Sequence, residues 1–232
     1  MTAILSNLQA VRAAMNQAAL MAKRDAAQIS LLAVSKTVAA SVIREAFSYG
    51  QHSFGENYLQ EALDKQNALR DLPLHWHFIG PIQSNKTRLI AENFSWVHSV
   101  DRLKIAERLS EQRPAHLPPL NICLQINVSG EASKGGVRPE DAEGLAHSIA
   151  LLPQLLLRGL MAIPAPADGL ENQRVPFALM QKLFTRLNKT GLNLDTLSIG
   201  MSHDLTAAIL EGATIVRVGT AIFGSRTIVE KK

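Results

Sequence analysis

Short apolar runs recur along the whole sequence, and polar or turn-forming residues bound each of them. The first run, Leu31 to Val34, leads directly into Ser35 and Lys36. Runs of this length without strict alternation are typical of strands that are buried on both faces of a parallel sheet. Strands are therefore predicted over residues 31–36, 53–57, 75–80, 96–101, 121–127, 157–164, 196–201 and 215–223.

The segments between these runs carry a helical period. Val42, Ile43 and Ala46 recur on one face, as do the apolar residues of 177–187. Strands that alternate with amphipathic helices predict a parallel sheet with helical crossovers. Eight such strands favour closure into an α/β fold of one domain, a single (β/α)8 TIM barrel over residues 1–232. A doubly wound open sheet is the alternative.

One helical pattern precedes the first strand. Ile4, Leu8, Val11 and Met15 fall on one face of the segment 2–24, whereas few residues follow the last predicted strand. Each strand of such a barrel needs a helix over its outer surface. The extra N-terminal helix is therefore expected to cover the flank that an eighth helix would otherwise cover.

Composition narrows the class of protein. Hydrophobic residues form 47% of the 232 residues and charged residues 19%, which supplies a packed core and argues against disorder. No apolar stretch approaches the about 20 residues of a membrane span, and no signal-type segment begins the chain, so a soluble cytoplasmic protein is expected. The single cysteine, Cys123, excludes an internal disulfide and, within an apolar run, predicts a core residue.

The net charge of +4 gives only a weak attraction for anions. The basic residues are scattered through helical segments without interleaved aromatic residues, so neither nucleic acid nor a membrane is an expected partner. A small phosphorylated ligand suits the same sign of charge.

Lys36 is the candidate with the most distinctive chemistry. It ends a predicted buried strand, so its side chain would face the mouth of a barrel rather than open water. A desolvated lysine loses proton affinity and becomes an amine nucleophile, as Schiff-base formation with a carbonyl cofactor requires. A solvated strand end is the alternative interpretation of the same residue.

Two glycine-containing turns follow the seventh and eighth predicted strands. Gly200 and Gly219 permit close backbone approach, and Ser202 and Thr220 bring hydroxyl groups. Barrels of this type commonly bind phosphate at these loops, although two ordinary tight turns would have the same composition. With Lys36 on the adjacent first strand, the set predicts a site for pyridoxal 5'-phosphate (PLP), which needs a reactive lysine beside a phosphate cup.

Three further features have simpler interpretations. His75 and His77 alternate on one strand, but no third ligand stands at a recognisable spacing, so no metal site is predicted. Asp101 is expected to cap a helix that starts just after it. Lys134 lies in the turn-rich segment 129–136, which is expected to be a mobile loop at the barrel mouth, and it either faces the ligand or is solvated.

Six motifs, in order along nearly the whole chain, carry a resemblance to a known family. They are residues 32–36 (LAVSK), 54–58 (FGENY), 75–80 with 83–86, 159–164, 197–202 and 216–224. On these motifs the chain resembles the pyridoxal phosphate homeostasis proteins of the YggS/PROSC type. The resemblance implies a barrel of the alanine racemase N-terminal-domain type that holds PLP as a Schiff base on Lys36.

The same resemblance implies roles for the other candidate residues. Ser202, Gly219 and Thr220 would hold the phosphate, and Arg217 would face the pyridine nitrogen. The remaining candidates for cofactor binding are Asn57, His77, Met161, Ser198, Gly200 and Met201. His203 stands where an acidic or small residue is common in the family, and this difference changes none of these roles.

Two functional classes fit these residues. One is a non-enzymatic protein that binds and supplies PLP within the cell and contacts PLP-requiring apoenzymes transiently. The other is a PLP-dependent amino-acid racemase. Racemases with this barrel add a C-terminal β-domain whose tyrosine is a second acid/base, whereas this sequence ends at residue 232 and has only Tyr49 and Tyr58. The binding protein is therefore favoured, no catalytic residue is assigned, and a monomer is expected.

Overall fold

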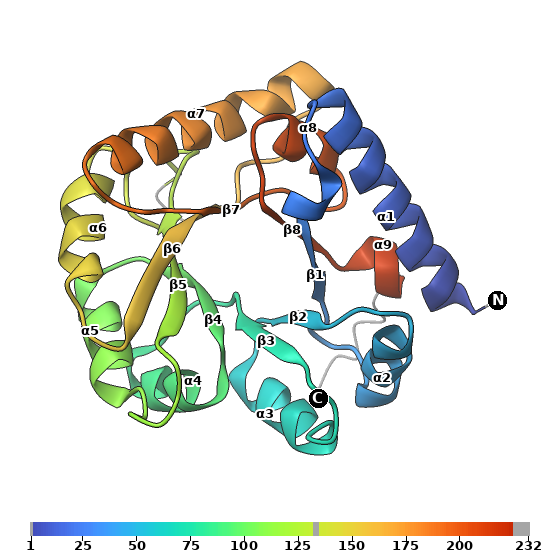
Figure 1. The fold of residues 1–232 in the computed structure, drawn as a ribbon, viewed down its shortest axis with the longest axis horizontal. Coiled ribbons are helices and arrows are strands. Elements are labelled where there is room, and N and C mark those ends of the chain that lie inside the picture. Colours follow the sequence, from blue (N-terminus) through green and yellow to red (C-terminus); the bar gives the residue numbers. More distant parts are fainter. Residues whose placement is uncertain (1, 132–134, 225–232) are drawn as a thin grey trace.

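The strands of the computed structural model, which describes residues 2–131 and 135–224, close into a barrel (Figure 1). Each strand pairs in parallel with the next, and β8 returns to pair with β1, where Leu31 lies opposite Val216. The strands are β1 Ser30–Val34, β2 Ser53–Glu56, β3 His75–Phe78, β4 Trp96–Val100, β5 Leu120–Ile126, β6 Leu155–Ala162, β7 Thr196–Ser198 and β8 Ile215–Val218. The predicted barrel is confirmed, and the open sheet was the wrong alternative.

Helices surround the barrel and follow its strands in turn (Figure 1). The α-helices are α1 Ala3–Met21, α2 Ala40–Ser48, α3 Leu59–Ala68, α4 Thr87–Asn93, α5 Leu103–Gln112, α6 Ala142–Ala150, α7 Leu170–Lys189, α8 Leu205–Leu210 and α9 Thr220–Phe223. Two short 3-10 helices, η1 Ala26–Gln28 and η2 Ser84–Lys86, precede β1 and α4.

The main hydrophobic core lies between the strands and this outer layer of helices. On α7 the buried residues are Phe177, Met180, Leu183 and Leu187, which is the face that their spacing predicts. Cys123 on β5 is buried as predicted, and burial raises the pKa of its thiol to about 12. A thiol held in the protonated form is a packing residue, not a nucleophile.

The N-terminal helix covers the flank where the helix after β8 is short. In Figure 1, α1 runs along the barrel beside α8 and α9. Leu8, Val11 and Met15 are buried on its inner face. The amide of Asn7 donates a hydrogen bond of 2.8 Å to the carbonyl of Ile222 in α9. The expectation that this helix takes the place of an eighth one is confirmed.

The eighth strand ends earlier than predicted. β8 stops at Val218, and the last residues of the predicted strand form α9, in which the N–H groups of Ile222 and Phe223 both donate to the carbonyl of Gly219. So short an apolar run fits a strand or a helix, and its periodicity cannot distinguish them. Ile222 is fully buried, so packing in a helix, not strand pairing, accounts for the apolar sequence.

The other strands also end before the predicted residue. As a result Lys36 and Asn57 belong to the loops that follow β1 and β2, not to the strands themselves. The residue at which a strand ends is what a local sequence pattern specifies least, because the loop after a strand can continue in an extended conformation.

Asp101 does not cap α5, so that prediction was wrong. The residue at the N-cap is Arg102, and its guanidinium donates to the Asp101 carboxylate at 2.6 Å. A charge-assisted bond to the neighbouring side chain competes with the backbone N–H groups of the helix for the same oxygens.

Lys134 lies outside the described residues. Within the described ranges, no helix is both long and apolar enough to cross a membrane.

Candidate functional site

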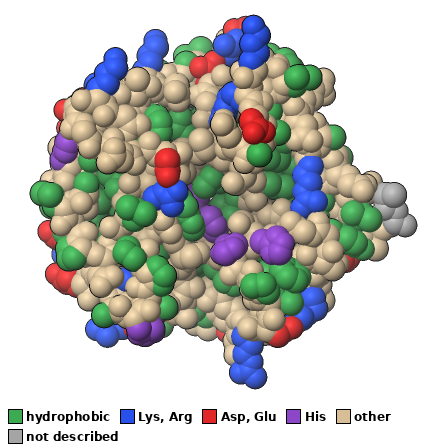
Figure 2. All heavy atoms as spheres, viewed as in Figure 1, with side chains coloured by type: hydrophobic (Ala, Val, Ile, Leu, Met, Phe, Trp, Pro, Cys, Tyr) green, Lys and Arg blue, Asp and Glu red, His purple; other side chains and the backbone are tan. Residues whose placement is uncertain are grey.

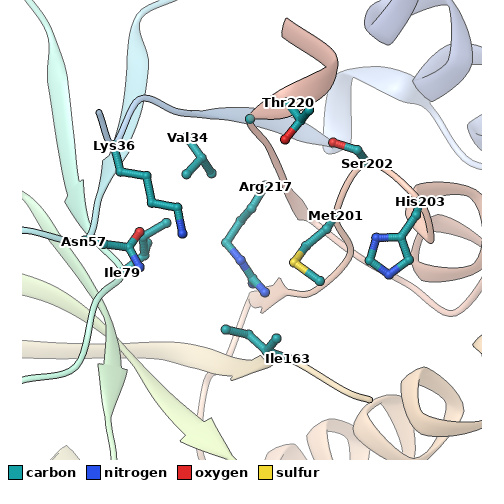
Figure 3. A pocket seen from close by; sticks show the side chains of 11 residues that line it. Val34, Lys36, Asn57, Ile79, Ile163, Met201, Ser202, His203, Arg217 and Thr220 are labelled. Carbon is teal, nitrogen blue, oxygen red and sulfur yellow. The ribbon is translucent and has the colours of Figure 1, made fainter. Parts of the chain in front are cut away.

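A cavity of about 240 Å³ opens on the side of the barrel where the strands end. In Figure 3, Lys36 reaches into it from one side, Arg217 lies in the middle, and Ser202 and Thr220 stand on the other side. The lining residues come from the ends of β1, β2, β3, β6, β7 and β8: Val34, Lys36, Asn57, Ile79, Ile163, Met201, Ser202, His203, Arg217, Gly219 and Thr220.

Seven of the residues singled out from the sequence line this cavity together: Lys36, Asn57, Met201, Ser202, Arg217, Gly219 and Thr220. Four do not line it. Met161 and Ser198 are buried neighbours on β6 and β7, Gly200 follows β7, and His77 is buried in the middle of the barrel on β3. Direct contact of these four residues with a cofactor stays a prediction.

The backbone on both sides of Lys36 is held by polar contacts. The Ser35 hydroxyl donates to Oε1 of Glu56 at 2.6 Å, and the Lys65 ammonium donates to the Ser35 carbonyl at 2.7 Å. The N–H of Thr37 donates to Oε1 of Glu61 at 2.5 Å. Lys36 therefore extends from a turn whose residues on either side are held in place.

These contacts form one group, here called the Lys65 cluster: Ser35, Glu56 and Lys65, which are buried, and Glu61, which is partly exposed. The Lys65 ammonium contacts Glu56 at 2.8 Å and Glu61 at 2.5 Å, and the Glu56 carboxyl is fully buried. Burial raises the pKa of Glu56, while the charge of Lys65 opposes that rise. Sequence reasoning missed this cluster, because nothing in the sequence indicates that Lys65 on α3 reaches back across β2.

Replacing Lys65 with methionine should destabilise the protein by about 3 kcal/mol, because it leaves the Glu56 carboxylate buried without its cation. The pKa of Glu56 would then rise further above its unfolded value of about 4.3. A raised carboxyl pKa contributes stability that is present below the unfolded pKa and is lost as pH rises through the folded one. Urea unfolding should therefore show the variant closer to the parent protein at about pH 5 than at about pH 8.

The double variant Lys65→Met with Glu56→Gln provides the control, because it removes both charges of the pair. It should recover part of the lost stability and remove the extra pH dependence. A Lys65→Met protein whose loss of stability is the same at both pH values would show that Glu56 is not the group left uncompensated.

Arg217 is a buried cation at the base of the cavity. It is 4% exposed, and its guanidinium donates to the Ser198 hydroxyl at 2.8 Å, to the Ser198 carbonyl and to the Ala162 carbonyl at 2.9 Å. Burial lowers its pKa to about 10, so it stays charged at neutral pH. Among the described residues no carboxylate lies within ion-pair distance of it, although the charge of the buried Asp204 acts on it and partly opposes that fall in pKa. A buried cation without a direct ion-pair partner favours an electron-rich ligand.

Asn57 presents a buried acceptor to the same cavity. Its Oδ1 is buried and has no hydrogen-bond partner within the described parts of the chain. The loop that carries it packs closely on Gly80, where a Cβ atom would lie 2.2 Å from the Asn57 carbonyl oxygen. Only glycine fits there, so the position of Asn57 depends on that close backbone approach. An unsatisfied buried oxygen calls for a donor from a ligand.

The opposite rim is formed by the loops after β7 and β8. Gly219 precedes α9, Thr220 is its first residue, and Ser202 faces them from the β7 loop (Figure 3). Gly200 has φ of +91°, and a Cβ there would lie 2.5 Å from Cβ of Ala208, so this turn also requires glycine. The rim places the hydroxyl groups of Ser202 and Thr220 at the cavity, and the binding of a phosphate there stays a prediction.

Four lining residues were missed by sequence reasoning: Val34, Ile79, Ile163 and His203. Val34 lies two residues before Lys36, and strand alternation would have placed it on the same side. His203 follows Ser202 directly and contacts the Asp204 carboxylate at 3.3 Å. The two isoleucines follow β3 and β6, and they make part of the wall apolar.

The cavity therefore combines an amine, a buried guanidinium, hydroxyl groups and an orphan amide oxygen, and no carboxylate is among its lining residues. This set suits an anion that also carries an electrophilic carbon. Within the described residues, no group of three or more His, Cys, Asp and Glu side chains is arranged to hold a metal ion.

Known proteins are similar to this chain over the whole barrel. Residues 1–227 match the family model of the alanine racemase N-terminal domain. The chain is 63% identical to a pyridoxal phosphate homeostasis protein of Pseudomonas aeruginosa over 97% of both chains, and 51% identical to that of Escherichia coli K12 over the full length of both.

Among solved structures, PipY of Synechococcus elongatus with PLP bound has a TM-score of 0.83 and 37% identity, over 95% of this chain and all of that one. The barrel, the ordered motifs and these full-length relatives agree. The chain belongs to the pyridoxal phosphate homeostasis protein family, with the fold of the alanine racemase N-terminal domain.

Proposed function

We propose that this protein binds PLP as a Schiff base on Lys36 and takes part in the cell's PLP (vitamin B6) homeostasis and supply without catalysing a reaction of its own. In this role it would be a cytoplasmic monomer that contacts PLP-requiring apoenzymes transiently. The observation that carries it is the meeting of Lys36, Arg217 and the hydroxyl rim in one cavity. Relatives named as PLP homeostasis proteins, and a neighbour solved with PLP, support the same ligand.

The residues of the cavity fit this cofactor. PLP supplies an aldehyde for an amine, a phosphate dianion and an aromatic ring with a nitrogen acceptor. Lys36 provides the amine, and Ser202, Gly219 and Thr220 would hold the phosphate. Arg217 would donate to the ring nitrogen, while the orphan Oδ1 of Asn57 would accept a hydrogen bond from the bound molecule. The cavity is lined by the basic side chains of Lys36 and Arg217, which suit a negatively charged ligand.

The same residues argue against efficient catalysis. Arginine donates hydrogen bonds and cannot accept one, so Arg217 would keep the ring nitrogen unprotonated and a weak electron sink. Racemisation needs a proton donor and a proton acceptor on opposite faces of the substrate carbon. Neither a tyrosine nor a carboxylate is among the lining residues, so apart from Lys36 only the half-exposed His203 could transfer a proton. The racemase alternative would need a group supplied from elsewhere.

Incubation with L-amino acids in heavy water tests this proposal. We expect the amine of the amino acid to displace Lys36 from the cofactor and release PLP, while the hydrogen on the α-carbon stays in place. Proton NMR follows deuterium at the α-carbon, and chiral chromatography follows the D-isomer. Deuterium incorporation or racemisation at rates typical of enzymes, on the order of 1 per second or faster, would favour the racemase instead.

A further inference from the structure

A series of buried polar side chains runs through the middle of the barrel, here called the core network: Arg217, Ser198, His98 and His77. The Arg217 guanidinium donates to Oγ of Ser198 at 2.8 Å, and Oγ lies 2.8 Å from Nδ1 of His98. Nε2 of His98 lies 2.9 Å from Nδ1 of His77. The four residues come from β8, β7, β4 and β3, and none is more than 5% exposed.

The directions of the hydrogen bonds in the core network are assigned starting from Arg217. A guanidinium has no acceptor, so Arg217 donates to the Ser198 oxygen. The other hydrogen-bond contact of this hydroxyl within the described residues is Nδ1 of His98, so we assign the Ser198 proton to that contact. His98 therefore carries its proton on Nε2 and donates it to Nδ1 of His77. His77 in turn carries its proton on Nε2.

Both imidazoles stay neutral, which keeps this direction fixed. Burial lowers the pKa of His77 to about 3, and burial together with the nearby His77 and Arg217 lowers the pKa of His98 well below its ordinary value. As neutral rings, His98 and His77 add no further positive charge beside Arg217. The nitrogen that each ring turns toward the Arg217 end of the network is Nδ1, which accepts a hydrogen bond.

The far end of the core network is also held in place. The His77 ring stacks on Trp96 at a centroid distance of 5.5 Å with planes 6° apart. Both residues line a second hollow, of about 250 Å³, where β1, β2, β3 and β4 begin. Figure 2 shows histidine side chains gathered around a hollow in the middle of the visible face. Sequence reasoning did not find His98, because nothing in the sequence indicates that His98 on β4 and Ser198 on β7 lie together.

We propose that His98 and His77 are positioning residues for Arg217: through Ser198 they orient its guanidinium as a donor toward the mouth cavity. The Ser198 hydroxyl can accept from Arg217 in a fixed geometry only while His98 accepts its proton. The Ser198 and Ala162 carbonyls then hold the other N–H groups. The effect on PLP rests on the proposed function, whereas the arrangement of protons does not.

Nitrogen-15 NMR of histidine-labelled protein without PLP tests the arrangement directly. Protonated and unprotonated ring nitrogens have well-separated shifts, and the His98→Asn and His77→Gln variants assign the two signals. We expect both rings to be neutral with the proton on Nε2, and Ser198→Ala to release His98 from that single form. A proton on Nδ1 of His98 in the parent protein would overturn the proposal, whatever the protein binds.

A second arm measures PLP binding in two variants of His98. Asparagine keeps an acceptor near the position of Nδ1, whereas leucine keeps similar bulk with no acceptor. We expect His98→Leu to weaken PLP affinity about tenfold and to shift the absorption maximum of the bound cofactor, because the Ser198 hydroxyl loses its acceptor. His98→Asn should stay within about twofold of the parent.

Equal affinity in the leucine variant and the parent, or equal losses in both variants, would overturn the positioning role. A parent protein that takes up no PLP would contradict the proposed function instead, and the NMR result would then decide the core network alone.

Discussion

Replacing Lys36 with alanine should reduce covalent PLP binding to background and remove the visible absorption of the bound cofactor. Among the described residues, Lys36 is the one lysine whose side chain lines the mouth cavity. Its removal takes away the nucleophile while the Lys65 cluster, which holds Ser35 and Thr37, remains. Absorption spectra of protein incubated with PLP measure the loss, and circular dichroism should show an unchanged fold.

Lys189→Ala is the matched control, because Lys189 is exposed in the last turn of α7 and does not line the cavity. It should bind PLP as the parent protein does. A Lys36→Ala protein that keeps the parent spectrum would show that another lysine carries the cofactor.

Loss of both rim hydroxyls should weaken PLP binding about a hundredfold. Ser202→Ala with Thr220→Val removes two donors to a phosphate dianion, and hydrogen bonds to charged groups contribute about 1.5 kcal/mol or more each. Valine keeps the shape of threonine, so the cavity should retain its volume. Equilibrium dialysis measures the affinity for PLP.

Pyridoxal, which lacks the phosphate, provides the control ligand. Its affinity for the parent protein should already be low, and the double variant should change it no more than about twofold, because no phosphate contact is left to lose. A variant that weakens PLP and pyridoxal by the same factor would place the phosphate somewhere other than this rim.

The barrel could be predicted from the sequence because each of its elements has a local pattern. The run before Lys36 is apolar without alternation, and Phe177, Met180 and Leu183 repeat with a helical period. The strand predicted through Phe223 was wrong because residues 220–223 are too few to show a period. They form α9, which packs on α1 through contacts that the local sequence does not reveal.

The residues that line the cavity were found in large part, because glycines, hydroxyls and a lysine at strand ends have a recognisable chemistry. The residues that hold them were not. His98 meets Ser198 across the barrel, 100 positions away in the sequence, and Lys65 reaches Glu56 from the following helix. Such contacts depend on the register and tilt of the strands, which no local pattern specifies.

Borohydride reduction of the unaltered protein with PLP, followed by proteolysis and mass spectrometry, tests the central claim most directly. Reduction turns the bond between an amine and the cofactor into a stable link, so the modified residue can be located. We predict a single phosphopyridoxyl group on the peptide that contains Lys36. A label on a different lysine, or no label at saturating PLP, would contradict the assignment of Lys36 as the residue that carries the cofactor.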